Sequence, residues 1–230
     1  MKTNSSHHKF DKEYLTHTLL CKKTCWLCST GLQKCGHTKG DIVIQNGANS
    51  AVGQSVIEIA KVLKLKTVNI VRDRPNIAEL KDDLISLGAD IVWTEEELRK
   101  TSDFRDKKLA KAKLALNCVG GQSSTEILKT LGKGGCHVTY GGMSLKPVIA
   151  PTSALIFKDI SVRGYWMSQW IEDNFDNPAR LEMYQKLAEM AKNGQLRPPK
   201  NSFVPLCDYK EVMDNCMKGF KNGKYIFDLS

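Results

Sequence analysis

From Gly40 onward, short apolar runs alternate with segments of helical periodicity, and this alternation restricts the fold more than any other feature of the 230-residue chain. Strands that are buried on both faces have nearly continuous apolar sequences, and the helices between them cover the sheet. The apolar runs are Ile42–Ile44, Val68–Val71, Ile91–Trp93, Leu114–Val119, Cys136–Tyr140 and Ile160–Trp166. The pattern therefore predicts a Rossmann-type, doubly wound parallel α/β fold.

The helices between these runs are predicted from apolar residues at helical spacing. The second helix is expected to end at Gly88, since glycine commonly follows a helix C-terminus. The apolar positions expected on the first, second and a later helix are Val52, Val56, Ile59, Ala60 and Leu63, then Ile77, Leu80, Leu84 and Leu87, then Ile127, Leu128 and Leu131.

After Ser168 the alternation stops, and the remaining segment is expected to belong to a different structural unit. The sequence there predicts a helix, a proline-containing segment, a short helix and a final strand, with the residues Leu181, Tyr184, Leu187 and Ala191, then 197–205, then a start at Asp208, then Lys224–Asp228. We therefore divide the chain into an irregular basic head (1–39), a cofactor domain (40–168) and a C-terminal segment (169–230).

Composition favours a soluble globular protein. The chain is 41% hydrophobic and 26% charged, and no apolar stretch reaches the roughly 18 residues that a membrane span needs. Of the formal net charge of +9, residues 1–40 carry +5, and the later lysines are scattered among acids, which is not typical of a nucleic-acid-binding stripe. We expect neither a nucleic-acid nor a membrane partner. Dispersed cysteines (Cys118, Cys136, Cys207 and Cys216) suit a reducing compartment.

The turn after the first strand is the candidate site for a dinucleotide diphosphate. Amide groups at a helix N-terminus and the helix dipole favour anions there. Aligned on Gly53, the turn has Ala48 and Ser50 in place of the first two glycines of the Gly-x-Gly-x-x-Gly fingerprint. The motif alone is weak, but its position between a strand and a helix strengthens it.

The second strand ends in Arg72-Asp73-Arg74 instead of the acidic residue that binds the ribose of NAD. Two guanidinium groups suit a 2′-phosphate, so this ending predicts a preference for NADPH. Asp73 would oppose a phosphate, and we expect it to point away or to cap the helix after Pro75. An alternative interpretation is that both arginines are solvated loop residues.

Several long runs resemble the mitochondrial trans-2-enoyl-CoA (enoyl-acyl-carrier-protein) reductases of the medium-chain dehydrogenase/reductase superfamily, in its zinc-free, quinone-oxidoreductase-like branch. They are NGANSAVGQSVIEIAK, TVNIVRDRP, LISLGAD, TEEELR, LALNCVGGQSSTEIL, GGCHVTYGGMS, IFKDISVRGYWMSQW and the closing KYI. The resemblance covers roughly residues 40–230, and it implies that the C-terminal segment is an incomplete remnant of a GroES-like catalytic domain.

The resemblance implies NADPH as cofactor. It places cofactor contacts in the phosphate turn, at the ribose, after the fifth and sixth strands and near the end of the chain, at Asn49, Ser50, Ala51, Val52, Arg72, Asp73, Arg74, Tyr140, Gly141, Gly142, Met143, Tyr165, Trp166, Met167 and Lys224. Gly141 and Gly142 would allow the backbone to approach the nicotinamide, and Tyr165 and Trp166 would flank a flat ring. Hydrophobic packing of those aromatic residues and a solvated Lys224 are the alternatives.

The implied reaction is hydride transfer from NADPH to the β-carbon of an enoyl thioester carried by CoA or acyl carrier protein. The proton donor in such enzymes is a tyrosine of an N-terminal catalytic domain, which residues 1–39 do not resemble, so we assign no catalytic residue and expect weak NADPH binding and little reduction. Further expectations are a homodimer through the cofactor domain or a heterodimer with a full-length subunit, and a mitochondrial location without an evident transit peptide. A non-catalytic NADPH-binding or dimerisation module is the alternative function.

The head contains a dense cysteine cluster, Cys21, Cys25, Cys28 and Cys35, with His37 close behind. Four thiolates, or three and an imidazole, would form a tetrahedral zinc site. The intervals depart from those of the structural zinc lobe of alcohol dehydrogenases, so we expect no metal there. His7 and His8 are likewise expected to be solvated.

Overall fold

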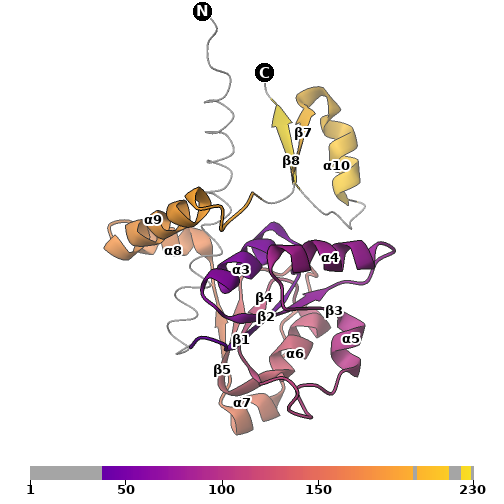
Figure 1. Ribbon diagram of the computed structural model, residues 1–230, viewed down its shortest axis with the longest axis vertical. Coiled ribbons are helices and arrows are strands. Elements are labelled where there is room, and N and C mark those ends of the chain that lie inside the picture. The colour runs from indigo at the N-terminus through magenta and orange to yellow at the C-terminus, as the bar shows by residue number, and fades with distance from the viewer. Residues whose placement is uncertain (1–37, 199–200, 218–223, 229–230) are drawn as a thin grey trace, which may run out of the picture.

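The computed structural model describes residues 38–198, 201–217 and 224–228. Its main sheet has six parallel strands in the order β3-β2-β1-β4-β5-β6, and helices connect successive strands (Figure 1). The elements of this sheet and its crossovers are β1 (Ile42–Asn46), α3 (Ala51–Val62), β2 (Lys66–Val71), α4 (Ile77–Leu87), β3 (Ile91–Thr94), α5 (Glu95–Lys100), β4 (Ala112–Asn117), α6 (Gly121–Lys129), β5 (Leu131–Thr139), α7 (Thr152–Lys158) and β6 (Ser161–Gly164). The predicted doubly wound fold is confirmed.

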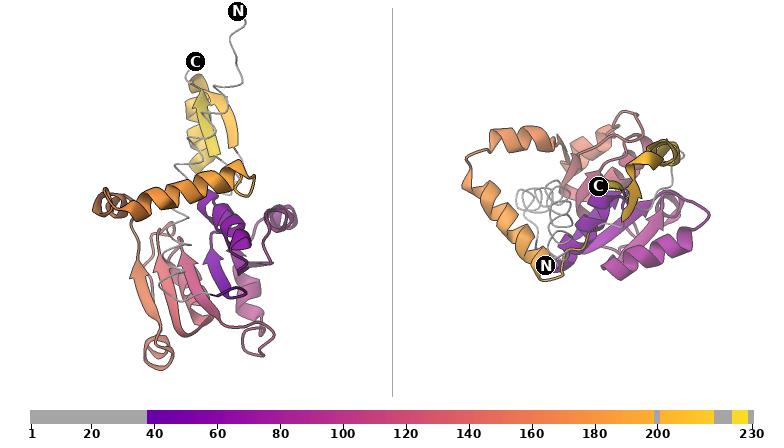
Figure 2. Two further views of the ribbon diagram at one scale, coloured as in Figure 1. Left: turned by 60° about the vertical axis from the view of Figure 1, so that its left-hand side comes forward. Right: turned by 90° about the horizontal axis from the view of Figure 1, so that it is seen from above.

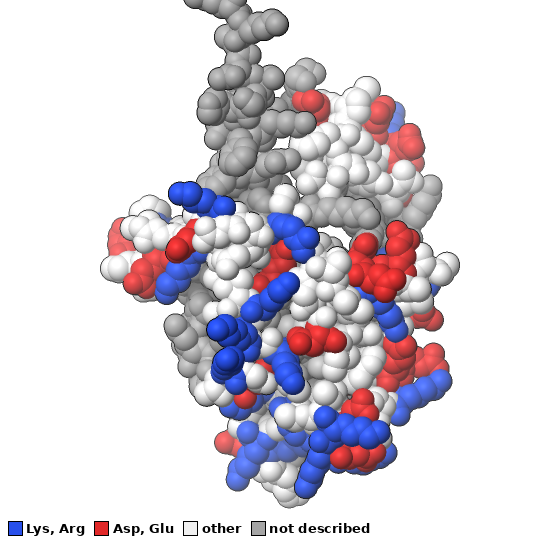
Figure 3. Space-filling model, viewed as in Figure 1, with Lys and Arg blue, Asp and Glu red and all other residues white. Residues whose placement is uncertain are grey.

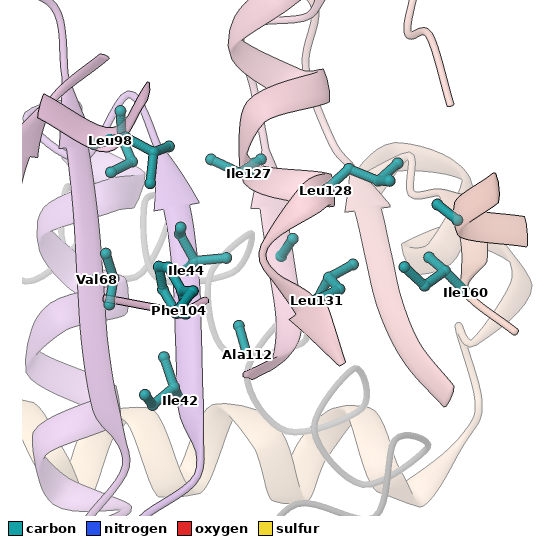
Figure 4. Close-up of a cluster of buried hydrophobic side chains, with 13 residues drawn as sticks. Ile42, Ile44, Val68, Leu98, Phe104, Ala112, Ile127, Leu128, Leu131 and Ile160 are labelled. Atoms are coloured by element: carbon teal, nitrogen blue, oxygen red, sulfur yellow. The ribbon is translucent and has the colours of Figure 1, made fainter. Parts of the chain in front are cut away.

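The central strands are mostly apolar because both faces of the sheet are covered there. On β1, Val43 packs with α3 on one face, whereas Ile42 and Ile44 pack on the other face. Figure 4 shows the second cluster, in which Leu98 of α5 and Ile127 and Leu128 of α6 meet the strand side chains. Burial of an isoleucine or leucine side chain contributes about 1.5 to 3 kcal/mol, so these clusters are the main source of stability in this domain.

Local signals fix the ends of several helices. Ser50 caps α3, and Thr94 caps α5 in a capping box with Glu97. Gly88 follows α4 in the left-handed conformation with φ of 111°, as the glycine stop predicted. The later helix is shorter than its apolar residues suggested, because α6 ends at Lys129 and Leu131 already begins β5.

Beyond β6 follow α8 (Met167–Asp173), α9 (Pro178–Lys192), β7 (Asn201–Pro205), the 3-10 turn η2 (Leu206–Asp208), α10 (Tyr209–Met217) and β8 (Lys224–Asp228). Helix α9 runs from the β6 side of the sheet toward α3 (Figure 2). It packs on the sheet through Met183 and Leu187, whereas Leu181, which the sequence placed on the buried face, is 61% exposed. The first part of the C-terminal segment therefore shares the core of the cofactor domain.

The last elements form a separate two-stranded parallel sheet, β7 with β8, joined by α10. The final strand and the short helix were predicted, but β7 lies inside the proline-containing segment 197–205, for which no strand was predicted. Apolar side chains are exposed here, including Phe203 at 48% and Met213 at 56%. No helix among the described residues is long and apolar enough to cross a membrane.

Candidate functional site

Four of the five predicted groups of cofactor residues gather at the carboxyl edge of the main sheet. They follow β1, β2, β5 and β6, and parallel strands present these ends at one edge. The strand order reverses between β1 and β4, which is the topological switch point where doubly wound sheets bind ligands. The groups are Asn49–Val52, Arg72–Arg74, Tyr140–Met143 and Tyr165–Met167.

The phosphate turn, residues 47–53, is tightly built against the start of α3. The Ser50 hydroxyl oxygen accepts a hydrogen bond from the Gly53 amide at 3.1 Å, and Gly47 adopts a φ of 61°. A Cβ on Gly53 would lie 2.5 Å from the carbonyl oxygen of Ala48, so only glycine permits this approach. The first turn of α3 contains no acidic residue, which leaves its N-terminal amides suited to an anion.

Arg72 and Arg74 follow β2 as a pair of cations. Arg72 is exposed, whereas Arg74 is 8% exposed. Burial lowers the pKa of Arg74, and the nearby positive charge of Arg72 lowers it further. Two like charges this close favour the binding of a dianion between or beside them.

Asp73 does not cap the next helix. Its Oδ1 accepts a hydrogen bond from the Arg74 amide at 2.9 Å, while Asn76 is the N-cap of α4 and makes no side-chain capping bond. The carboxylate therefore stabilises the bend between the two arginines, and the cap alternative is wrong.

An open depression lies where β5 and β6 end. It is lined by Tyr140, Tyr165, Trp166, Met167 and Ser168, four of which were predicted to contact the cofactor. Trp166 is 69% exposed, whereas Tyr165 is half-buried and its hydroxyl points to the Met167 sulfur at 2.7 Å. Burial raises the pKa of Tyr165, so this phenol stays neutral. A flat ring bound here would meet aromatic and sulfur surfaces.

The remaining predicted residue, Lys224, is not on this edge. It begins β8 in the second sheet, where its Cα pairs with that of Asn201. The structure therefore brings four groups of predicted residues together and places the fifth, Lys224, in the second sheet.

Two buried asparagines beneath the site were missed by the sequence reading. Asn46 ends β1 and Asn117 ends β4, and the Asn46 Nδ2 donates to the Asn117 Oδ1 at 2.8 Å. Both side chains are at most 1% exposed. A polar residue that closes an otherwise apolar strand was the available signal, in IVIQN and LALN.

The metal hypothesis concerns residues that lie outside the described part of the chain, since Cys21, Cys25, Cys28, Cys35 and His37 all precede residue 38, as do His7 and His8. Within the described ranges, no group of three or more His, Cys, Asp or Glu side chains is arranged to hold a metal ion.

The strand order, the small-residue turn and the helix that it opens define a Rossmann-type dinucleotide-binding domain. The chain belongs to the zinc-binding dehydrogenase family, whose profile matches residues 51–186. It is 50% identical over 193 residues to the human protein named mitochondrial enoyl-[acyl-carrier-protein] reductase, a match that covers 83% of this chain and 51% of the human protein.

The protein of that name from Caenorhabditis elegans is 49% identical over 187 residues, covering 81% of this chain and 53% of the relative. The chain thus spans about half the length of the curated relatives that it matches. Among solved structures, Etr1p in complex with NADP and crotonyl-CoA is similar at 32% identity with a TM-score of 0.74, over 86% of this chain and 57% of that one. An Etr1p/Etr2p heterodimer from Candida tropicalis matches equally well.

Proposed function

We propose that this chain provides the NADPH-binding domain of a 2-enoyl-thioester reductase. The observation that carries the proposal is the arginine pair at the end of β2, where an NAD-specific domain carries an acid. Arg72 and Arg74 follow β2 on the same sheet edge as the phosphate turn, as binding of the 2′-phosphate and the diphosphate of one cofactor requires. The relatives named as enoyl reductases support the substrate class.

The site residues fit the parts of NADPH one by one. The N-terminal amides of α3 and the Ser50 cap suit the diphosphate, and Arg72 and Arg74 suit the 2′-phosphate. The depression at Tyr165 and Trp166 suits the nicotinamide ring. The resemblance also assigns a cofactor contact to Lys224, at the start of β8.

NADPH bound in this way would supply a hydride to the β-carbon of a trans-2-enoyl thioester of CoA or acyl carrier protein. The residues of this chain would orient the ring and exclude water from one of its faces, which hydride transfer requires. By resemblance, the proton for the α-carbon would come from a tyrosine of the N-terminal catalytic domain of such enzymes.

NADPH consumption in the presence of crotonyl-CoA tests the proposed reaction. The proposal predicts that this chain alone reduces crotonyl-CoA only slowly, with NADPH in preference to NADH, and that adding it to a catalytic subunit of the same family raises the rate above that of the subunit alone. A folded chain that binds NADPH but reduces nothing under either condition would favour the alternative function, a binding or dimerisation module.

A surface at the β6 edge of the main sheet supports the alternative function, a dimerisation module. Strand β6 is an edge strand with three of its four residues exposed. Helix α7, which precedes it, leaves Ile156 67% and Phe157 77% exposed. An edge strand beside an apolar surface suits pairing with a second cofactor domain, either of this chain or of a full-length subunit.

Light scattering after gel filtration tests this surface. The Phe157→Asp variant should shift the chain toward monomer, since a charge would replace an apolar contact. Leu181→Asp on α9 is the matched control because Leu181 is similarly exposed, at 61%. A dimer that survives Phe157→Asp, or that Leu181→Asp disrupts as strongly, would place the interface elsewhere.

We also propose a mitochondrial location, since the named relatives are mitochondrial. We propose neither a nucleic-acid nor a membrane partner. Acidic and basic side chains both occur on the face shown in Figure 3.

A further inference from the structure

We propose that Asn117, together with Asn46, is a positioning residue that holds the loop at the nicotinamide end of the site. The inference rests on the proposed NADPH function. Neither asparagine is expected to touch the cofactor. Both act through backbone groups of two connected segments, the β4 turn (residues 118–120) and the β5 loop (residues 140–147).

The asparagine pair fixes the β4 turn from below. Asn46 Oδ1 accepts a hydrogen bond from the Cys118 amide at 2.9 Å. Asn117 Oδ1 accepts from the Val119 amide at 3.2 Å and the Gly120 amide at 3.0 Å. Three consecutive backbone donors of the turn are thus satisfied by two buried side chains, which are themselves joined at 2.8 Å.

The β5 loop is held by backbone hydrogen bonds to the β4 turn. The Met143 amide donates to the Cys118 carbonyl at 3.0 Å, and the Ser144 amide donates to the Val119 carbonyl at 2.9 Å. The β4 turn and the β5 loop also pack closely, since a Cβ on Gly120 would lie 2.6 Å from the Lys146 carbonyl oxygen. The segment Tyr140–Met143 therefore takes its position from the turn that the asparagines hold.

A third contact extends the network to β5. Asn117 Nδ2 donates to the Thr139 hydroxyl at 3.1 Å, and Thr139 is the last residue of β5, directly before the loop. The side chains of Asn46, Asn117 and Thr139 thus connect the ends of β1, β4 and β5. A shift in this ladder would displace the loop at the depression without moving Arg72 or Arg74, which follow β2 on the other side of β1.

The chain contains a matched control on that other side. Asn69 is as fully buried as Asn117, at 0% exposure. It accepts from the Gln45 side chain at 2.8 Å and donates to Thr67 at 2.9 Å and to the Ile91 carbonyl at 3.0 Å. None of these bonds reaches the β4 turn or the β5 loop, so Asn69→Ala removes a comparable network without disturbing the loop.

The test compares two ligands that share the adenosine end. NADPH spans the whole site, whereas adenosine 2′,5′-bisphosphate lacks the nicotinamide. Calorimetric dissociation constants for both are measured with the wild type, Asn117→Ala and Asn69→Ala, and thermal unfolding is followed in parallel. Asn117→Ala should weaken NADPH about tenfold or more and change the bisphosphate by less than about twofold.

Both variants should lower the melting temperature, but only Asn117→Ala should change the ratio of the two dissociation constants. Equal changes in the ratio for both variants, or an unchanged ratio in Asn117→Ala, would overturn the inference. If Asn117→Ala does not fold, Thr139→Val decides: losing one bond should shift the ratio about threefold, and no shift would overturn it. A folded wild type that binds neither ligand would overturn the proposed function, and this inference with it.

Discussion

Arg197 donates hydrogen bonds to the buried carboxylate of Glu58 from both its backbone amide and its side chain. The Arg197 amide donates to Glu58 Oε2 at 3.1 Å, and its Nε donates to Glu58 Oε1 at 3.0 Å. Glu58 belongs to α3, the helix that the phosphate turn opens, and Arg197 precedes β7. This contact attaches the segment before β7 to α3. That segment leads to the second sheet, which contains Lys224.

Breaking that contact should destabilise the domain. Burial raises the pKa of Glu58 even though Arg197 acts to lower it, so the carboxylate depends on its partners. Arg197→Ala should lower the free energy of unfolding by about 1 to 2 kcal/mol, because the backbone donor remains and the arginine side chain is 53% exposed. Urea denaturation measures the change.

The exposed pair between Lys100 and Glu96 is the control, with side chains 75% and 58% exposed. Lys100→Ala should change the free energy of unfolding far less than Arg197→Ala does, because solvent screens this pair. Equal losses in the two variants would mean that burial of Glu58 adds nothing to its pairing with Arg197.

Acid should destabilise the domain through His137. This side chain on β5 is fully buried beside the Ser124 hydroxyl, at 3.0 Å, and burial lowers its pKa from 6.5 to about 4. The unfolded chain takes up a proton below pH 6.5 and the folded chain does not, so the stability is complete above 6.5 and is lost as the pH falls toward 4. Between pH 7.5 and 5.5 the loss should be about 1 kcal/mol.

His137→Gln separates this effect from that of other titrating groups. Glu58 acts in the opposite direction, because its raised pKa makes the folded chain bind a proton more readily than the unfolded one. The wild type minus variant difference in unfolding free energy should therefore shrink at the lower pH. A difference that stays constant from pH 7.5 to 5.5 would show that His137 titrates normally.

Gly53→Ala should abolish the phosphate turn. The added methyl group would lie 2.5 Å from the Ala48 carbonyl oxygen, so either α3 or the turn must move, and the affinity for NADPH should fall by about tenfold or more. Gly164→Ala is the control, since a Cβ there meets no atom within 4 Å. NADPH binding that survives Gly53→Ala would mean that the diphosphate lies elsewhere.

The strand and helix order could be predicted from the sequence because the central strands β1, β2 and β4 are almost fully buried, which makes their apolar runs easy to recognise. Periodicity located only part of the buried face of α9: Leu187 was predicted, whereas Met183 is buried by contact with a sheet that is distant in sequence. It also missed β7, whose partner strand β8 follows in sequence only after α10.

At the site, the sequence revealed the residues whose chemistry is readable locally, such as Arg72 and Arg74 after an apolar strand. It could not reveal Asn46 and Asn117, because their role depends on β1 and β4 becoming neighbours across 71 residues. The position of Asp73 also required the structure, since its bond to the next amide replaces the cap expected for α4.

The most direct test of the account is a fluorescence titration of the folded chain with NADPH and with NADH, repeated with Arg72→Ala. We expect an NADPH preference of about 10- to 100-fold that the variant largely loses, since a charge-assisted bond to the 2′-phosphate contributes about 1.5 to 3 kcal/mol. Equal affinity for the two dinucleotides, or a preference that Arg72→Ala leaves unchanged, would contradict the assignment of the arginine pair and with it the proposed cofactor.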